Sequence, residues 1–220
     1  MNGLPRTRTW RTALVGGVVT AVILAGVMAT ALWRTDRTSA TAAITSSTPT
    51  APAVRAIPEH APPVAASDDP VTFARAVATT LFAWDTTDRR PVDAHRDPII
   101  AVGDPAGIET PGLVADLALY LPTAEAWKLL SGYSTRQWLD ITAAAVPASW
   151  PGIAANAPAG SLAPGTTAVT IDGIRHRAGT WEGEHVHDKF TVAFTMFVVC
   201  GPTHPTCHLL RLGALDTPLR

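Results

Sequence analysis

The chain has 220 residues, of which 18 are acidic and 17 are basic, and charged residues make up only 16% of it. From residue 68 to the end there are 16 acidic and 11 basic side chains, a net charge of −5. Nucleic-acid phosphates attract basic patches, so this balance argues against direct nucleic-acid contact by that part of the chain.

The N-terminal region predicts a membrane anchor. Residues 13–33 contain no charged side chain, and a helix of that length spans about 30 Å, the thickness of the hydrocarbon core. Arg6, Arg8 and Arg11 precede the apolar segment, so the positive-inside rule places the tail at 1–12 in the cytoplasm and the remainder outside. We therefore expect a single-pass protein of the cell membrane. The alternative is a signal peptide cleaved after Ala31, which would also export the domain.

The composition changes twice after the apolar segment. Residues 34–67 are rich in threonine, alanine, serine and proline and have no aromatic and few large aliphatic side chains that could build a core. This composition predicts a disordered linker. Residues 68–220 are long enough for one extracytoplasmic domain with its own hydrophobic core.

The first half of that domain has helical periodicity. Asp69 and Pro70 suit the cap and first turn of a helix whose apolar stripe runs through Phe73, Val77 and Leu81 to Trp84. We expect irregular chain over 92–110, helices from 110 to 121 and from 123 to 130, a further helix from 134 to about 145, and a loop around 150.

The last third changes to strand periodicity. The segments 166–174, 180–200 and 207–215 are rich in β-branched and aromatic residues. Helices followed by antiparallel strands predict an α+β domain in which a curved sheet packs against the helices. The tryptophans of this domain are expected to lie in its core: Trp84, Trp127, Trp138 and Trp150.

The two cysteines, Cys200 and Cys207, flank a short loop between two predicted strands. In an oxidising compartment they are expected to form a disulfide. Free thiols are one alternative. A metal site that also uses His204 and His208 is another, although the spacing is tighter than in the usual zinc patterns.

A second group of histidines also allows metal binding. His185 and His187 alternate along a predicted strand and would share a face with Trp181. His176 could supply a third ligand, whereas Glu182 has the opposite parity. A polar strand edge or hairpin turn explains the same pattern without a metal, and we predict neither a metal site nor a cofactor.

Other polar groups have ordinary explanations as well. The basic cluster Arg175-His176-Arg177 suits either a partner contact or a solvated strand face. Asp85 and Asp88 resemble a carboxylate pair but follow a helix end, where polar residues are common. No nucleophile elbow, zinc-protease helix or phosphate-binding loop occurs, and no catalytic residue is predicted.

The layout resembles the bitopic scaffold proteins of conjugative type IV secretion systems, the VirB-eight class, and their TcpC-type relatives. The resemblance is carried by the opening helix FARAVATTLFAWD, by Trp127 and Trp138, and by the ending FTVAFTMFVVCGPTHPTCHLLRLGALDTPL. It implies a nuclear transport factor two-like fold that self-associates, contacts other channel subunits and has no catalytic residues. Many TcpC-type proteins have two such domains, whereas this chain has room for one.

These observations lead us to expect a non-catalytic assembly subunit of a cell-envelope conjugative type IV secretion complex. Its expected partners are other secretion-channel subunits, a second copy of the chain, and the bilayer through residues 13–33. The alternatives are a membrane protein of the type associated with lipid-import (Mce) loci, an extracytoplasmic ligand-binding module, and a secreted metal-dependent enzyme built around the histidines.

Overall fold

The computed structural model describes residues 63–220. The predicted tail (1–12), the predicted membrane helix (13–33) and the predicted linker up to residue 62 lie outside the described residues. Within 63–220, no helix is both long and apolar enough to cross a bilayer. Val64 is buried in the core and the Ser67 carbonyl accepts a hydrogen bond from the Cys207 N–H, so the packed part of the chain includes residues before Asp68.

Helix α1 (Pro70–Phe82) begins as predicted, because the Asp69 carboxylate accepts a hydrogen bond of 2.7 Å from the Thr72 N–H and Pro70 occupies the first turn. The apolar stripe of α1 faces the sheet and is buried. Trp84 is also buried, in the short strand β1 (Trp84–Asp85) that follows α1.

The other helices agree with the sequence prediction in part. Helices α3 (Thr110–Leu117) and α4 (Ala124–Gly132) lie where predicted. The prediction of irregular chain over 92–110 is wrong over α2 (Asp93–Ile100), whose sequence is half polar and includes Pro98. The predicted loop around 150 contains the short helix α5 (Trp150–Ala155), and a 3₁₀ turn, η1, occupies Thr86–Asp88.

The predicted helix from 134 to about 145 is also wrong, because this segment is strand β2 (Arg136–Ala145). Its buried residues, Gln137 and Leu139, alternate with more exposed neighbours. Burial of Gln137 is stabilised by the Arg177 guanidinium, which donates to its amide oxygen at 2.8 Å. Pairing with the next strand therefore overrides the helical preference of the alanines at the end of β2.

The sheet is antiparallel and curved, with strand order β1-β2-β3-β4-β5. Strands β3 (Thr166–Trp181) and β4 (Glu184–Val199) form a long hairpin whose register is constant from Trp181↔Glu184 to Thr166↔Val199. Glu182 and Gly183 make its two-residue turn, both with positive φ, as a tight hairpin requires. Strand β5 (His208–Leu212) pairs with β4 over Met196–Val199, and its Leu209 also bridges Gly103.

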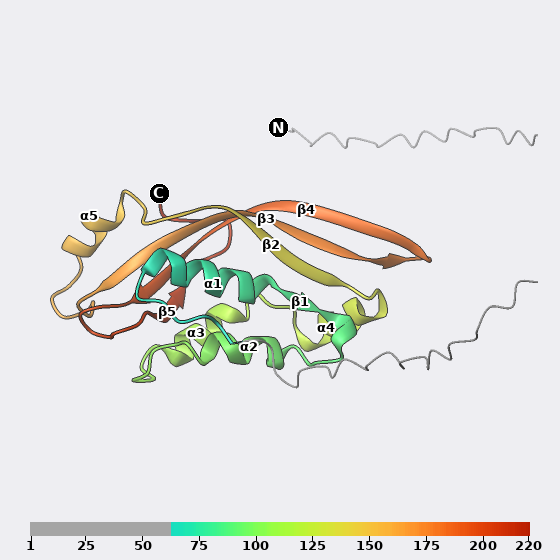
Figure 1. Cartoon of the computed structure of the whole chain (residues 1–220), viewed down its shortest axis with the longest axis horizontal. Helices are drawn as coiled ribbons and strands as arrows, with labels where there is room; N and C mark the ends of the chain where they lie inside the picture. Colours follow the sequence, from blue (N-terminus) through green and yellow to red (C-terminus); the bar gives the residue numbers. More distant parts are fainter. Residues whose placement is uncertain (1–62) are drawn as a thin grey trace, which may run out of the picture. The chain divides into compact units, whose positions relative to one another are not determined.

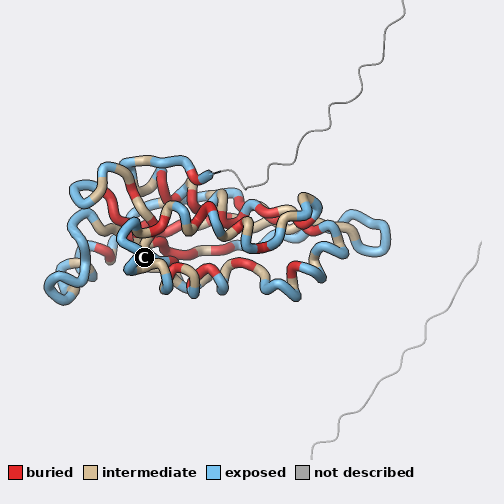
Figure 2. The backbone as a smooth tube through the Cα atoms, turned by 90° about the horizontal axis from the view of Figure 1, so that it is seen from below, coloured by how far each residue is buried: buried red, intermediate tan, exposed pale blue. Residues whose placement is uncertain are grey.

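Helices α1 to α4 lie on one side of the sheet, and the core lies between the two layers (Figures 1 and 2). One end of the hairpin is also covered on its other side. There the Thr170 hydroxyl donates to the Leu219 carbonyl, and Trp150 of α5 packs on Phe197. We call this part, residues 166–173 with 192–199, the covered end.

The remainder of the hairpin, residues 174–191, is here called the hairpin end. Every residue of β4 from Glu184 to Thr191 is exposed, and the hairpin turn projects past the helices (Figures 1 and 2). Its surface opposite α1, here called the open face, has no helix or C-terminal segment packed on it among the described residues. The hairpin end is thus the least covered part of the sheet.

Candidate interaction site

The cysteines lie where the sequence predicts a bond. The sulfur atoms of Cys200 and Cys207 are 1.98 Å apart, at disulfide distance, and the pair links the end of β4 to the start of β5. Because these sulfurs bond each other, they are not free to act as metal ligands.

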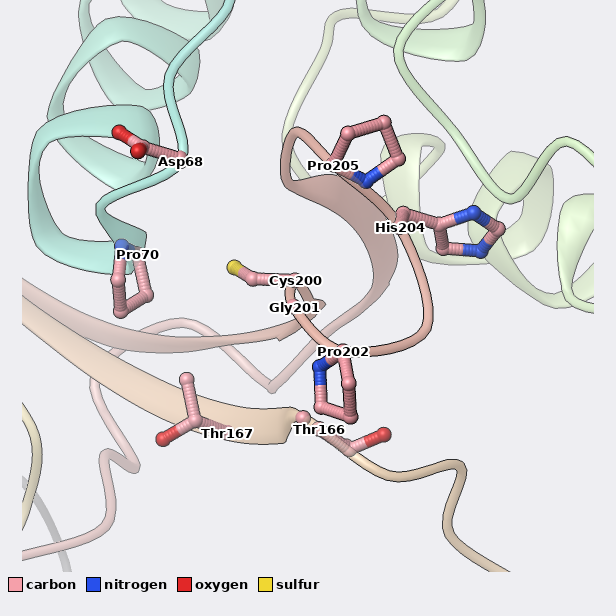
Figure 3. Close-up of a pocket in the computed structure, with 10 residues that line it drawn as sticks. Asp68, Pro70, Thr166, Thr167, Cys200, Gly201, Pro202, His204 and Pro205 are labelled. Carbon is pink, nitrogen blue, oxygen red and sulfur yellow. The ribbon is translucent and has the colours of Figure 1, made fainter.

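A hollow of about 730 Å³ lies beside this disulfide, between the start of α1 and the end of β4. Asp68 and His204 are its two ionisable lining residues. Figure 3 shows that their side chains point away from each other, so the hollow has no converging pair of polar groups that could bind or activate a substrate.

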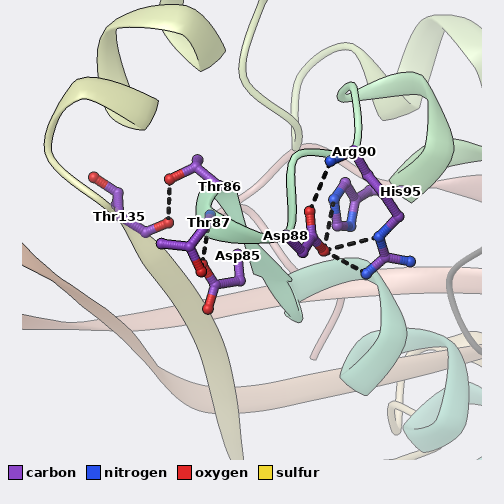
Figure 4. Close-up of polar contacts among 7 residues, drawn as sticks. All are labelled: Asp85, Thr86, Thr87, Asp88, Arg90, His95 and Thr135. Carbon is purple, nitrogen blue, oxygen red and sulfur yellow. Dashed lines mark hydrogen bonds and ion pairs between the residues drawn. The ribbon is translucent and has the colours of Figure 1, made fainter. Parts of the chain in front are cut away.

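Asp85 and Asp88 do not act as a pair (Figure 4). The Asp85 carboxylate accepts from the N–H and hydroxyl of Thr87 and caps η1. The Asp88 carboxylate accepts two bonds from the Arg90 guanidinium. Each carboxylate is thus held by its own local partner, as expected for residues that end a helix and form a turn.

His95 of α2 is buried beside this cluster. Its ring packs against Trp127 with a centroid distance of 5.0 Å, and its Nε2 atom lies 3.8 Å from Asp88 Oδ2, too far for a hydrogen bond. Burial lowers the pKa of His95 below its ordinary value, and the attraction of Asp88 opposes this only in part. His95 is therefore held neutral in the folded protein at neutral pH.

His185 and His187 lie on β4 just after the hairpin turn, which confirms the expectation of a strand edge and turn. The expectation that they share a face with Trp181 is wrong. The chain turns at Glu182-Gly183, and Trp181 belongs to β3, where its ring stacks on Tyr133. No group of three or more His, Cys, Asp or Glu side chains in residues 63–220 is arranged to hold a metal ion.

The structure instead joins His187 to His176 and Trp138 on the open face. His176 Nδ1 and His187 Nε2 are 3.1 Å apart and share a hydrogen bond. Both imidazoles lie nearly parallel to the Trp138 indole, with interplanar angles of 4° and 7° and centroid distances of 4.9 and 5.5 Å. Trp138 is half-buried, unlike the other three tryptophans predicted for the core, because these imidazoles cover it rather than a helix.

Two charged groups extend this cluster along β2. The Arg136 guanidinium lies 5.5 Å from the Trp138 ring centre. His176 Nε2 lies 2.9 Å from Asp140 Oδ2, although the two groups are not aligned for a hydrogen bond. Tryptophan and arginine side chains are enriched at protein interfaces.

A hollow of about 640 Å³ lies in the same face. Its floor includes Ala178, which pairs with Arg136 on one side and with His187 on the other. The small side chain of Ala178 leaves space between two larger ones that can carry positive charge. His185 and several hydroxyl side chains complete the lining.

The predicted basic cluster at 175–177 is divided between the two faces of the sheet. His176 lies on the open face, whereas Arg175 and Arg177 face the helical layer. The Arg175 guanidinium lies over Phe190, and that of Arg177 lies over Trp84. The two arginines therefore serve packing, and the open face takes its positive charge from other residues.

Comparison of this chain with protein-family models, curated proteins and solved structures found no significant match. The family resemblance noted in the sequence therefore stays a hypothesis.

Sequence reasoning missed the cluster of Trp138 with His176. The signal was present as strand parity, because Trp138, His176 and His187 all fall on the same face once β2 is known to be a strand. The assignment of β2 to a helix concealed it.

Proposed function

We propose that this chain is a membrane-attached, non-catalytic assembly subunit of a cell-envelope complex, of the kind that builds conjugative type IV secretion channels. The observation that carries the proposal is the hairpin end, which extends past the helices with one face and one strand edge uncovered among the described residues. Strands that contribute little to a core but remain ordered are suited to bind another chain.

Two further observations support the same proposal. Large apolar side chains are exposed at the hairpin end: Trp181, Val186 and Phe190 are 51%, 46% and 47% exposed. A disulfide between Cys200 and Cys207 agrees with an oxidising, extracytoplasmic compartment. The predicted segment 13–33 would anchor the domain there, and the resemblance to scaffold proteins supplies the secretion complex as its setting.

Site-specific cross-linking in native membranes tests this proposal. A photo-reactive amino acid replaces His187 on the open face of the full-length protein, and a control protein has it in place of Arg75, which is exposed on α1. We expect position 187, and not position 75, to yield a discrete adduct that mass spectrometry identifies as a secretion-channel subunit. Absence of any adduct with another envelope protein from position 187 would refute the assembly role.

A second candidate function, a ligand-binding module, is favoured by the hollow at Ala178 and its cationic rim. Native mass spectrometry of the full-length protein distinguishes the two functions. A small molecule that co-purifies at one per chain, and is lost when Arg136 is replaced by glutamine, would favour the module.

A further inference from the structure

The β4 edge from Glu184 to Val192 has no strand beside it among residues 63–220. Strand β5 reaches only Met196, and the chain after β5 covers two more positions. There the N–H groups of Gly213 and Asp216 each donate at 2.7 Å, to the carbonyls of Thr195 and Ala193 respectively. Beyond Ala193 toward the hairpin turn, the edge is free.

The orientation of the backbone along this edge follows from parity. The carbonyls of Ala193 and Thr195 point to the β5 side, and the register of the β3–β4 hairpin is constant. Backbone direction alternates along a strand, so the odd-numbered residues direct both N–H and C=O to the free edge. Those residues are His185, His187, Lys189 and Thr191.

The side chains of three of these residues form what we call the basic row: His185, His187 and Lys189, all on the open face. Arg136 and His176 lie beside the row on β2 and β3. Two acidic groups lie on the same face, where Asp140 contacts His176 and Asp85 binds Thr87. The edge strand itself has no acidic side chain on this face, because Glu184 and Asp188 have the opposite parity.

Pairing of this edge with a second copy is disfavoured by charge. Two identical antiparallel strands related by a two-fold axis must oppose residues of the same parity. Centred on Asp188 or Lys189, such pairing would lay that charged residue opposite itself in the other copy. Centred on Val186, it would lay Glu184 opposite Asp188. Like charges directly opposite each other destabilise a sheet.

The opposite side of the edge alternates acidic and apolar side chains. Val186 and Phe190 face the helical side of the sheet, where both are about half exposed, and Glu184 and Asp188 share that side. A strand added at this edge would therefore place every second side chain against the basic row and the others beside Val186 and Phe190.

We propose that the β4 edge binds an extended segment of a partner protein in which acidic and apolar residues alternate, as an added antiparallel strand. This inference rests on the proposed assembly function and specifies the chemistry of the partner. Backbone hydrogen bonds at the four odd positions provide affinity, and the basic row selects acidic side chains.

Binding of a synthetic peptide to the full-length protein in detergent tests the inference. The probe is an eight-residue peptide of alternating glutamate and valine, and the matched peptide has lysine in place of glutamate. We expect the acidic peptide to bind at least tenfold more tightly, because several opposite-charge cross-strand pairs replace like-charge pairs. Equal binding of the two peptides would overturn the inference.

Hydrogen–deuterium exchange with residue-level resolution locates the bound strand. Saturation with the acidic peptide should slow exchange at the amides of 185, 187, 189 and 191. The even-numbered amides between them already bond to β3 and should not change. Unchanged exchange at the four odd positions would rule out strand addition even if the peptide binds.

Charge reversal supplies the matched variants, because the chain has only two lysines, Lys128 and Lys189, and both are exposed. Lys189→Glu combined with His187→Glu should weaken binding of the acidic peptide about tenfold or more, and Lys128→Glu should leave it unchanged.

Cross-linking in membranes separates this inference from the function on which it rests. If position 187 cross-links a channel subunit in the wild type and equally in the Lys189→Glu variant, the assembly role stands and the acidic-strand inference fails. If position 187 cross-links only a second copy of the chain, the acidic partner is also overturned. If no envelope partner is found but the acidic peptide binds and slows amide exchange at 185, 187, 189 and 191, the inference about the β4 edge holds and the assembly role fails.

Discussion

The two ends of the β3–β4 hairpin are formed by the same two strands in one continuous register, yet their surroundings are opposite. At the covered end, Ile171 and Phe194 are fully buried between helices and sheet, and the C-terminal segment covers the other face. At the hairpin end, β4 is exposed from Glu184 to Thr191 and bears histidines, a lysine, acidic residues and half-exposed apolar side chains.

This difference separates two tasks along one pair of strands. Burial of apolar surface stabilises the fold mainly at the covered end, because there both faces are removed from water. The hairpin end buries little surface, so its ordered extension past the helices adds little to stability. Substitutions at the two ends should therefore change different properties, stability at one and binding at the other.

The largest difference in the free energy of unfolding is expected between alanine variants of two phenylalanines on the same face of β4. Phe194 is fully buried and packs on Phe82 and Tyr120, whereas Phe190 is 47% exposed. Phe194→Ala should lower the free energy of unfolding by about 3–5 kcal/mol, and Phe190→Ala by about 1 kcal/mol or less. Urea denaturation followed by circular dichroism measures both, and equal losses would contradict the division between the ends.

The disulfide should have the next largest effect. It closes a loop with a sequence separation of seven at the covered end. Chain-entropy arguments for a loop of this length give about 2–3 kcal/mol of stabilisation. The double variant Cys200→Ala, Cys207→Ala should lose that amount in urea denaturation and keep its binding to the acidic peptide. A loss of binding together with a small change in stability would show that the loop serves the hairpin end instead.

Buried His95 predicts a response of stability to pH. The folded protein holds the pKa of His95 below its ordinary value of 6.5, chiefly by burial, so the unfolded chain binds a proton that the folded chain does not. Stability should therefore fall as the pH drops below about 6.5, by at most about 1.4 kcal/mol per pH unit from this one group.

Thermal or urea denaturation between pH 7.5 and pH 5 measures this slope. His95→Gln should make the slope shallower, because the replacement does not titrate. The matched variant His187→Gln, on the open face, should leave most of it in place. A slope unchanged in His95→Gln would show that other groups control the acid response.

The sequence predicted the elements whose side chains repeat strongly. The stripe Phe73, Val77 and Leu81 defined α1, and the β-branched run in β4 defined the long strand. The cysteine pair could be predicted because the two cysteines flank a short loop between two predicted strands, where a hairpin brings them close together. These features depend on local sequence, so their prediction needed no knowledge of the tertiary contacts.

The wrong predictions concern segments whose secondary structure depends on contacts with residues distant in sequence. In β2, Gln137 occupies a buried position only because Arg177 and the Phe82 carbonyl bond its side chain, and these partners are far away in sequence. The cluster of Trp138 on the open face forms only because residues 136–145 are a strand. The assignment of this segment to a helix therefore prevented prediction of the candidate site. In α2, burial of His95 produced no apolar stripe that periodicity could detect.

The smallest expected effect on stability belongs to the residue expected to matter most for binding. Lys189 is exposed and pairs directly with His176 across β3 and β4. Lys189→Glu should change the free energy of unfolding by no more than about 0.5 kcal/mol at neutral pH.

Urea denaturation of Lys189→Glu at neutral pH, beside Lys128→Glu, provides the measurement. An unchanged free energy of unfolding in both variants, with loss of acidic-peptide binding in the Lys189 variant alone, would show that the basic row contributes to binding and not to stability. Residues of that kind are retained for recognition rather than for folding. A clear destabilisation by Lys189→Glu would instead assign the row a structural role and remove the contrast between the two ends of the hairpin.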